Sequence, residues 1–430
     1  MKNSMGERSD ESVKPILSSF PPPKESDGNT TFVAMRHRNF QLYIGGQLVS
    51  NIGTWMQIVA QGWVVYQIGH SQLTLGLVAF ASAIPTLLIS PWAGVIVDRT
   101  SRRKLLMMTQ TGAMILAFIL AALAFANVVR EWHVIILAAL LGVVNAFDAP
   151  ARQAFVPEMV GKKDLPNAIA LTSMMFNSAR VIGPAIAGLA LAAIGSAWCF
   201  TLNGISFLAV LIGLWLMKLP PLRRIQHTTS PWQQLVGGLK YTANNREISA
   251  LILLSLVFSV FGISYATILP AFVQNNLHQG AMAFGWVNAA IGFGAVTGAF
   301  LLANHRISNG RRGQFLVLVN IIFPVLLIIF SFTSSYTLAL FLAYGLGVGF
   351  MVQFTTLNTL LQTRVEDEFR GRVMGLYTIT FFGFSPIGNL LIGFLGEKWG
   401  LGIAMTAFAI CSLILSRVVL MRTPELQKLQ

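Results

Sequence analysis

Long stretches without a charged residue alternate with short charged segments along this chain of 430 residues. The two longest runs without Asp, Glu, Lys or Arg cover residues 39–97 and 248–305, which are 59 and 58 positions. A membrane-crossing helix needs about 20 apolar residues, so each run is long enough for two helices joined by a turn. Together with the shorter runs they predict twelve spans, which lie within residues 39–97, 105–129, 132–151, 165–217, 248–305, 313–363, 373–396 and 399–420.

These runs are much longer than the alternating segments of about ten residues that form membrane β-strands. The pattern therefore predicts an all-α membrane protein and not a barrel. The composition agrees, since 54% of the residues are hydrophobic and 11% are charged, against about 25% charged residues in an average soluble domain. A soluble enzyme, a coiled coil and a disordered chain are excluded as the main body.

Polar segments divide the chain into two predicted lobes of six helices each, residues 36–218 and 248–422. Residues 1–35 contain three consecutive prolines and mixed charges, which predict a disordered tail. Residues 219–247 form a polar linker, and residues 423–430 form a second tail.

The linker contains its own helix signal. Ser230 can cap a helix that Pro231 begins, and the apolar residues after it recur at helical spacing. This pattern favours a helix on the inner membrane surface, with an irregular linker as the alternative. The apolar face consists of Trp232, Leu235, Val236 and Leu239.

The basic residues give the orientation. If the N-terminus lies in the cytoplasm, the outer loops carry only Arg130 and Lys398 of the 30 Lys and Arg residues. Such an excess of basic residues in cytoplasmic loops is typical of inner-membrane proteins. We therefore expect a multi-pass protein of the inner (plasma) membrane with both termini cytoplasmic. The net charge of +14 follows this distribution, so it indicates membrane topology and not nucleic-acid binding.

The two predicted lobes match each other at a fixed offset of 209 residues. Arg102-Arg103 corresponds to Arg311-Arg312, and Gln153-x-x-Val156 corresponds to Gln362-x-x-Val365. The two long neutral runs also begin 209 residues apart, at 39 and 248. An internal duplication of six helices, joined by a polar linker, is the layout of major facilitator transporters.

A loop motif and a helix motif carry a resemblance to the same superfamily. Residues 94–104, which include Gly94, Asp98, Arg99, Arg102 and Arg103, resemble the major facilitator loop signature, with Ser101 where a glycine is usual. In the fifth span, Arg180-Val-Ile-Gly183-Pro184-Ala-Ile-Ala-Gly188 resembles the antiporter motif of the superfamily. Asp148-Ala-Pro-Ala-Arg152 and Arg370-Gly-Arg-Val resemble the branch that includes enterobactin and macrolide exporters.

This resemblance implies a two-lobe transporter that works by alternating access and draws energy from an ion gradient, with protons as the expected ion. It also implies that Asp98 holds the inner gate closed by accepting bonds from the start of the eleventh span, near Arg372. The second half has Ile307 in the equivalent place, so such an acidic latch is one-sided.

Asp148 is the only acidic residue within the predicted fourth span. An ionisable group at membrane depth is costly unless it is paired or hydrated. Arg102 is its expected partner by the family pattern, and Arg152, four residues further along the same helix, is the local alternative. The carboxylate then acts either as a conformational latch or as a proton carrier.

Arg180 lies near the middle of the fifth span, and its counterpart in the second half is Phe382. One interpretation is that Arg180 meets an anionic group of the substrate or pairs with Asp148. The alternative is that it binds backbone carbonyl groups freed by a kink at Pro184. Gly183-Pro184 would bend the helix, and Gly188 would let a neighbouring helix approach closely.

Polar residues at helical spacing mark the walls of a predicted central cavity. Amide and hydroxyl groups there can hold a polar substrate, although such residues also form bonds that only pack helices together. The candidate cavity residues are Gln47, Asn51, Thr54, Gln61, Asn145, Asn177, Arg180, Ser259, Tyr265, Gln353 and Asn358.

The sequence contains no catalytic triad, no cysteine and histidine spacing for a metal, and no phosphate-binding loop. We therefore expect no enzyme activity, no cofactor and no metal site, and we expect a monomer. Cys199 and Cys411 lie far apart in apolar stretches, which favours small core residues. The sequence predicts export of a small organic molecule, such as a siderophore or drug, by proton antiport. A lysophospholipid flippase, a uniporter or importer, and a sensor that does not transport are the alternatives.

Overall fold

The computed structural model describes residues 30–218, 231–303 and 311–428, and within these ranges every regular element is a helix. The predicted all-α architecture is therefore confirmed. The helices of the N-terminal half are η1 (Thr30–Arg36), α1 (Arg38–Gly69), α2 (Gln72–Arg99), α3 (Arg102–Phe125), α4 (Glu131–Ala193) and α5 (Ser196–Leu216).

The C-terminal half begins after the linker helix α6 (Pro231–Asn244). Two of its long helical segments are interrupted by π or 3-10 turns, one between α7 and α8 and the other between α13 and α14. The elements of this half are α7 (Arg246–Val257), η2 (Phe258–Gly262), η3 (Ser264–Ile268), α8 (Leu269–Asn275), α9 (Ala281–Ala303), α11 (Arg312–Phe332), α12 (Tyr336–Arg364), α13 (Asp367–Thr378), η4 (Ile379–Gly383), α14 (Ser385–Trp399), α15 (Leu401–Arg422) and η5 (Pro424–Lys428).

Both expected tails extend into ordered helices. Thr30–Arg36 forms η1, in which Ala34 is fully buried and its N–H donates to the Asn167 Oδ1 at 3.0 Å. At the other end, η5 places Leu426 in the core. Ala34 and Leu426 are thus buried against the lobes, although the segments around them are mostly polar. Residues 1–29, 219–230 and 429–430 lie outside the described residues.

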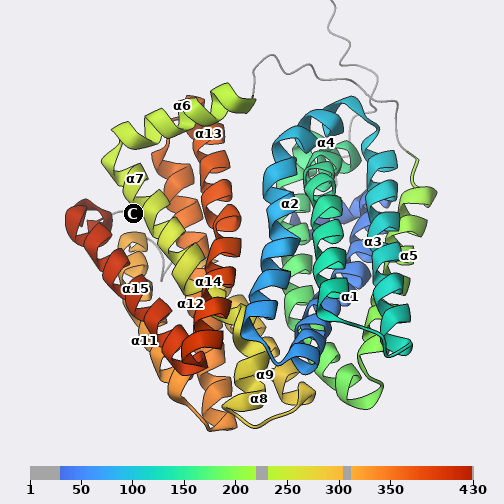
Figure 1. The fold of residues 1–430 in the computed structure, drawn as a ribbon. Helices are drawn as coiled ribbons and strands as arrows, with labels where there is room; N and C mark the ends of the chain where they lie inside the picture. Colours follow the sequence, from blue (N-terminus) through green and yellow to red (C-terminus); the bar gives the residue numbers. More distant parts are fainter. Residues whose placement is uncertain (1–29, 219–230, 304–310, 429–430) are drawn as a thin grey trace, which may run out of the picture.

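The two halves of the chain form two helical bundles that stand side by side (Figure 1). The bundles diverge toward the end that carries α6 and α13, which we call the linker end (Figure 1). They converge at the opposite end, which carries α8 and which we call the far end (Figure 1). At the linker end, α6 packs on α13, where the rings of Tyr241 and Phe369 stack with centroids 4.3 Å apart.

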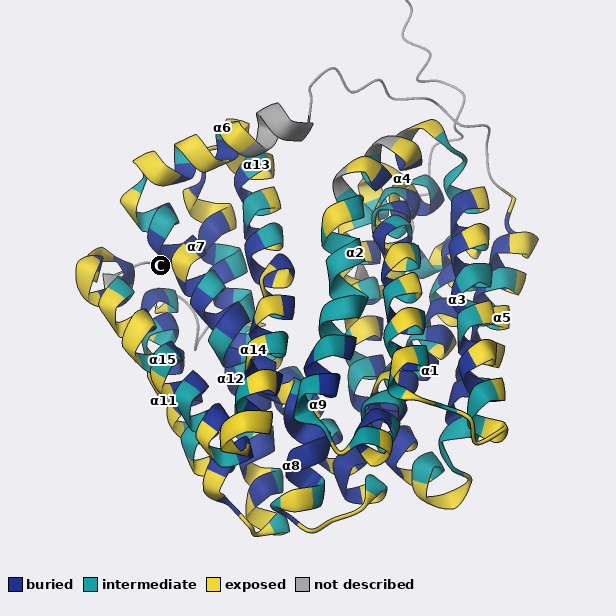
Figure 2. Cartoon of the chain, in the orientation of Figure 1, coloured by how far each residue is buried: buried dark blue, intermediate teal, exposed yellow. Residues whose placement is uncertain are grey.

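Ten helical segments of the described chain are long and apolar enough to cross a membrane. Many large apolar residues of these helices are exposed, and Figure 2 shows exposed positions along the helices of both halves. Phe300, Phe341 and Met421, for example, are about 70% exposed, at 72%, 71% and 70%. A surface of this kind matches lipid and not water, because contiguous apolar patches of such extent are rare on soluble monomers.

Helix α4 contains a break that changes how it relates to a membrane. Its 63 residues would extend roughly 95 Å as one helix, about three times the thickness of the hydrocarbon core. At Gly161 the backbone leaves the helix with φ of 72° and ψ of 175°. A positive φ of this size suits glycine, because it has no Cβ. The break separates residues 131–160 from residues 162–193.

The two bundles touch where glycines let helices approach closely. A Cβ on Gly188 of α4 would lie 2.8 Å from the Gly285 Cα of α9, and a Cβ on Gly76 of α2 would lie 2.6 Å from the Asn389 backbone oxygen of α14. These two crossings, α4 with α9 and α2 with α14, join the halves. A larger side chain at either site would separate them.

Candidate functional site

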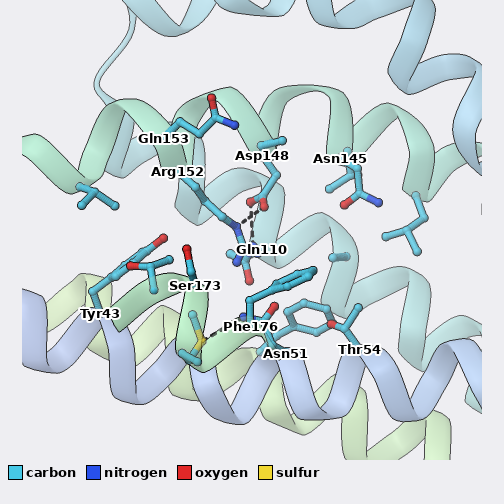
Figure 3. A pocket seen from close by; sticks show the side chains of 18 of the residues that line it. Tyr43, Asn51, Thr54, Gln110, Asn145, Asp148, Arg152, Gln153, Ser173 and Phe176 are labelled. Atoms are coloured by element: carbon cyan, nitrogen blue, oxygen red, sulfur yellow. Dashed lines mark hydrogen bonds and ion pairs between the residues drawn. The ribbon is translucent and has the colours of Figure 1, made fainter. Parts of the chain in front are cut away.

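A pocket of about 770 Å³ lies among α1, α3, α4 and α5 of the N-terminal half (Figure 3). Every side chain that lines it comes from this half, and most of its surface is apolar. The polar part of the wall includes four of the predicted cavity residues, namely Asn51, Thr54, Gln61 and Asn145. The sequence thus indicated the pocket residues of α1 and α4, but not that one half alone would form the pocket.

An ion pair between Asp148 and Arg152 projects into this pocket from one side of α4 (Figure 3). The two residues are four positions apart, so they face the same way one helical turn from each other. Asp148 is 6% exposed. A buried charge of this kind is stable only when its partner and its other lone pairs are satisfied.

Three side chains donate hydrogen bonds to the Asp148 carboxylate. The Oδ1 atom accepts hydrogen bonds from the Thr109 hydroxyl at 2.8 Å and from the Gln110 Nε2 at 2.7 Å, while Oδ2 accepts from Arg152. Arg152 also donates to the amide oxygen of Gln47, which is 1% exposed and lies behind the pocket wall. The network therefore ties α1, α3 and α4 together through one carboxylate.

The expected pairing of Asp148 with Arg102 is wrong, and Arg152 is the partner instead. Arg102 begins α3 and pairs with Glu158 instead of Asp148. Glu158 lies ten positions beyond Asp148 in α4, which is about 15 Å along the helix axis. The family pattern indicated that Arg102 pairs with an acid on α4. The position of α3 along α4 selects Glu158, which lies just before the break at Gly161. Glu158 was not among the predicted site residues.

The remaining residues of the loop motif lie at the α2–α3 turn. Arg103 donates to the Trp215 carbonyl at 2.8 Å and to the Met217 carbonyl at 3.2 Å, so it caps the end of α5. Arg99 ends α2, and Gly94 has open space where a Cβ would be. The Asp98 side chain lies outside the described residues, so its expected contact with the eleventh span stays a prediction.

Arg180 lies between the two halves. Its guanidinium carbon is 4.4 Å from the ring centre of Phe350 on α12 and 5.6 Å from that of Trp55 on α1. The backbone of Arg180 is also at the α4–α9 crossing, because a Cβ on Gly292 would lie 3.1 Å from the Arg180 carbonyl oxygen. Neither Asp148 nor a backbone carbonyl of the described chain binds this guanidinium, which differs from two of the predicted interactions.

The two aromatic rings offset only part of the cost of placing this cation in a membrane. An arginine at the centre of a membrane helix costs about 2.5–3.5 kcal/mol, and a cation over an aromatic face gains about 0.5–2 kcal/mol. The rings also supply no acceptor for the N–H groups of the guanidinium. Arg180 therefore keeps its hydrogen-bond donors unused within the described part of the chain.

The other predicted cavity residues do not line this pocket. The Ser259 hydroxyl donates to the Phe381 carbonyl, Gln353 bonds with Asn320 at 3.0 Å, and Tyr265 packs on Phe323 and Phe330. Asn358 accepts a hydrogen bond from Gln362. Asn177 donates to the Ser173 carbonyl one turn earlier. The contacts of Ser259 and Gln353 join two helices and match the packing alternative for these two residues.

Polar contacts close the far end between the halves. Asn275 donates to the Tyr66 hydroxyl at 2.6 Å, and the amides of Gln67 and Gln274 meet at 2.9 Å. The Glu397 carboxylate at the end of α14 accepts from the Gln72 N–H at the start of α2, at 2.8 Å. An anion at a helix N-terminus is favourable because unpaired N–H groups point at it. Sequence reasoning missed Glu397, although it is an isolated acid beside the basic residue of a predicted outer loop.

Two helical halves that cross at glycine contacts, with a pocket among membrane-spanning helices, form an architecture typical of membrane transporters. The chain belongs to the transmembrane secretion effector family of the major facilitator superfamily, whose profile matches residues 29–429. This confirms the resemblance that the loop and helix motifs carried, and it identifies a multi-pass protein of the bacterial inner membrane.

Curated relatives match nearly the whole chain. The staphyloferrin A transporter of Staphylococcus aureus is 27% identical and covers 85% of this chain and 92% of its own length. The multidrug efflux pump Tap of Mycobacterium tuberculosis is 26% identical over 90% of this chain and 94% of its own length. The enterobactin exporter EntS of Escherichia coli is 26% identical, with coverage of 87% and 88%.

Solved structures share the fold. A bacterial homologue of the human lysosomal transporter Spinster, in an inward-facing and unoccupied conformation, superimposes with a TM-score of 0.69 at 15% identity. It covers 93% of this chain and 98% of its own chain. The nucleoside transporter NupG superimposes with a TM-score of 0.66 at 13% identity, with coverage of 89% and 98%. At these identities the match concerns the architecture alone.

Proposed function

We propose that this protein exports a small organic molecule across the inner membrane by alternating access, in exchange for protons. The pocket carries this proposal. Ligand sites of drug-sized molecules typically enclose about 300–1,000 Å³, with mostly apolar walls and a few placed polar groups. The pocket of the N-terminal half has about 770 Å³ and this kind of wall. The relatives named for a siderophore transporter, a siderophore exporter and a multidrug pump support the same substrate classes.

We further propose twelve spans with both termini in the cytoplasm. The break at Gly161 supports two crossings in α4, since residues 131–160 and 162–193 are each long enough to cross. Helix α1 is the twelfth span in this proposal. It has 32 residues, and the amides and hydroxyls that line the pocket lower its hydropathy below that of its neighbours.

With this topology the linker end faces the cytoplasm, and the structure represents an inward-facing state. The contacts of Glu397, Tyr66 and Gln67 with the opposite half then form the closed outer gate. Export requires these contacts to break while the linker ends approach. Such rocking of one repeat against the other around a site near the midplane is how transporters of this architecture work.

Asp148 is the acid that would take up the proton, because it is the only carboxylate among the residues that line the pocket. Protonation would remove the charge that holds Arg152 in place. The network with Thr109 and Gln110 would then loosen between α3 and α4. A proton would thus be linked to a change in the pocket wall, and no cofactor is needed.

The proposal is tested in cells that lack the gene and carry a plasmid copy, by measuring the accumulation of a panel of drugs and siderophores with and without a protonophore. We expect at least one compound whose efflux depends on the protein and stops with the protonophore. Asp148→Asn keeps the shape of the side chain, and we expect it to retain exchange of that compound but to lose gradient-driven efflux. Efflux that the protonophore leaves unchanged would favour a uniporter or flippase instead. If no compound moves, the proposed substrate classes are wrong.

A further inference from the structure

Arg180 is a membrane-depth cation without a counter-ion in the described chain. The ion pairs there join Arg102 with Glu158, Arg152 with Asp148, and two other pairs that do not include Arg180. Its guanidinium makes no hydrogen bond to the described residues either. The kinked helix at Pro184 therefore does not explain why an arginine stands at this position.

No carboxylate is left to pair with Arg180 among the described residues that face the pocket. Asp148 accepts three bonds and neutralises Arg152. In the opposite half, the sequence has no Asp or Glu between residues 248 and 363. The acid of α7, Glu247, lies in its first turn, so the rest of α7 and the helices up to α12 bring no acid to the interface. Counting Asp148, Arg152 and Arg180, the pocket and its border carry one uncompensated positive charge.

Arg180 borders the pocket through aromatic side chains. Phe176, which lines the pocket, lies four residues before Arg180 on α4 and thus one turn away on the same face. The ring of Phe176 meets the ring of Trp55 edge-on, with centroids 5.9 Å apart, and Trp55 lies under the guanidinium. Phe176 and Trp55 thus connect the pocket wall to the guanidinium of Arg180.

We propose that Arg180 binds the carboxylate of an amphiphilic organic anion whose apolar body occupies the pocket. The guanidinium fork presents parallel N–H donors that match the two oxygens of a carboxylate. The rings of Trp55 and Phe350 lie against the guanidinium and supply no acceptor atom for these donors. Because Phe350 belongs to the other half, binding of the anion to Arg180 depends on how the two halves are placed against each other. This inference rests on the proposed function and specifies its substrate class.

An anionic substrate also fits the proposed direction of transport. The inside-negative membrane potential drives negative charge outward. Proton entry in exchange for an anion moves charge in the same electrical direction, so both movements draw on the potential. A cationic substrate would have to move against it.

The test uses the purified full-length protein in detergent and two fluorescent probes, rhodamine 110, which has a free carboxyl group, and rhodamine 123, its methyl ester. Binding is measured by fluorescence anisotropy. We expect wild-type protein to bind rhodamine 110 about tenfold to a hundredfold more tightly than rhodamine 123. Arg180→Gln should abolish that preference by weakening rhodamine 110 without weakening rhodamine 123. Arg180→Lys should recover part of it, since the charge remains without the fork.

Arg364→Gln serves as the matched control, because it removes an exposed cation at the end of α12 and should leave the preference unchanged. Equal binding of both probes, a loss of both in Arg180→Gln, or binding of neither would overturn the inference. The assay needs no gradient and no transport. A preference without efflux in cells would therefore contradict the proposed function alone, and efflux without the preference would contradict only the role of Arg180.

Discussion

The two halves of this protein match in sequence at a fixed offset, yet they place opposite kinds of side chain at corresponding positions. At the offset of 209 residues, Asp148 corresponds to Leu357 and Arg152 corresponds to Leu361. Both leucines are fully buried, at 0% exposure. One half thus keeps a charged pair beside a pocket, and the other fills the same place with apolar side chains.

Aromatic rings complete the core of the C-terminal half. Phe381 lies at the centre of a cluster, with ring centroids 5.1 Å from Phe354, 5.9 Å from Tyr377 and 6.3 Å from Phe258. Two members, Phe258 and Phe381, stand in the π-helical turns of η2 and η4. The comparison shows that, among the described residues, the buried ion pair is confined to one lobe. A buried ion pair gains little stability over apolar packing, so its retention in one lobe points to function.

The largest effect should come from giving the N-terminal half the residues of its counterpart. Asp148→Leu or Arg152→Leu alone leaves an uncompensated charge in the membrane, and each should lower the free energy of unfolding by about 3–5 kcal/mol. The double variant removes both charges and should recover more than half of that loss. Transport should be absent in all three. The measurement is equilibrium unfolding of the detergent-purified protein as a double-mutant cycle.

If the decrease in the free energy of unfolding of the double variant equals the sum of the two single decreases, Asp148 and Arg152 do not stabilise each other. The proposed role of their ion pair would then be wrong. Transport by the double variant would show that the charged pair is dispensable and that the difference between the lobes has no functional meaning.

Phe381→Ala should have a somewhat smaller effect, confined to the packed half. Truncation of a buried phenylalanine costs about 3–5 kcal/mol at most sites, and the cluster can relax at the neighbouring π turn. The apparent free energy of unfolding should fall toward the lower end of this range, while probe binding in the N-terminal pocket stays within twofold. Phe382→Ala is the control, because Phe382 is 58% exposed against 1% for Phe381. Equal destabilisation by both variants would argue against a rigid aromatic core.

Glu397→Gln should have the smallest effect, because it alters a contact between the halves and not either half. A charge at a helix N-terminus contributes about 0.3–1 kcal/mol, so the equilibrium should shift by about twofold to fivefold away from the state shown here. Labelling of single cysteines placed at the two ends measures this shift, with Cys199 and Cys411 replaced beforehand. Lys398→Gln, next in sequence and without a hydrogen bond to the other half among the described contacts, should leave the labelling rates unchanged. Unaltered labelling in Glu397→Gln would remove the latch role of this carboxylate.

Much of the site was accessible from the sequence because helical periodicity fixes which residues share a face. The stripe on α1 contains Asn51, Thr54 and Gln61, and these residues line the pocket of the N-terminal half. The same periodicity on α12 indicated Asn358, which instead bonds with Gln362 on its own helix. A pattern along one helix does not show what the opposite helix presents.

Which residues of different helices contact each other could not be predicted from the sequence. The local partner of Asp148 was foreseeable, since Arg152 is one turn away. Whether Arg102 meets Asp148 or Glu158 depends on how far α3 slides along α4, and several apolar packings of two helices satisfy the same pattern. The contact of Glu397 with the first turn of α2 spans 325 residues and depends on the docking of the two halves.

The sequence by itself determined the membrane class, the all-helical architecture and the superfamily. These follow from hydrophobic length, the distribution of basic residues and local motifs, all of which act over one or two helices. Only the tertiary structure decided that the pocket belongs to one lobe, that Arg180 lies between Trp55 and Phe350 without an acid, and which end of the molecule is closed. The reason is physical, because a helix face specifies what is buried, whereas the geometry of packing selects the partner it is buried against.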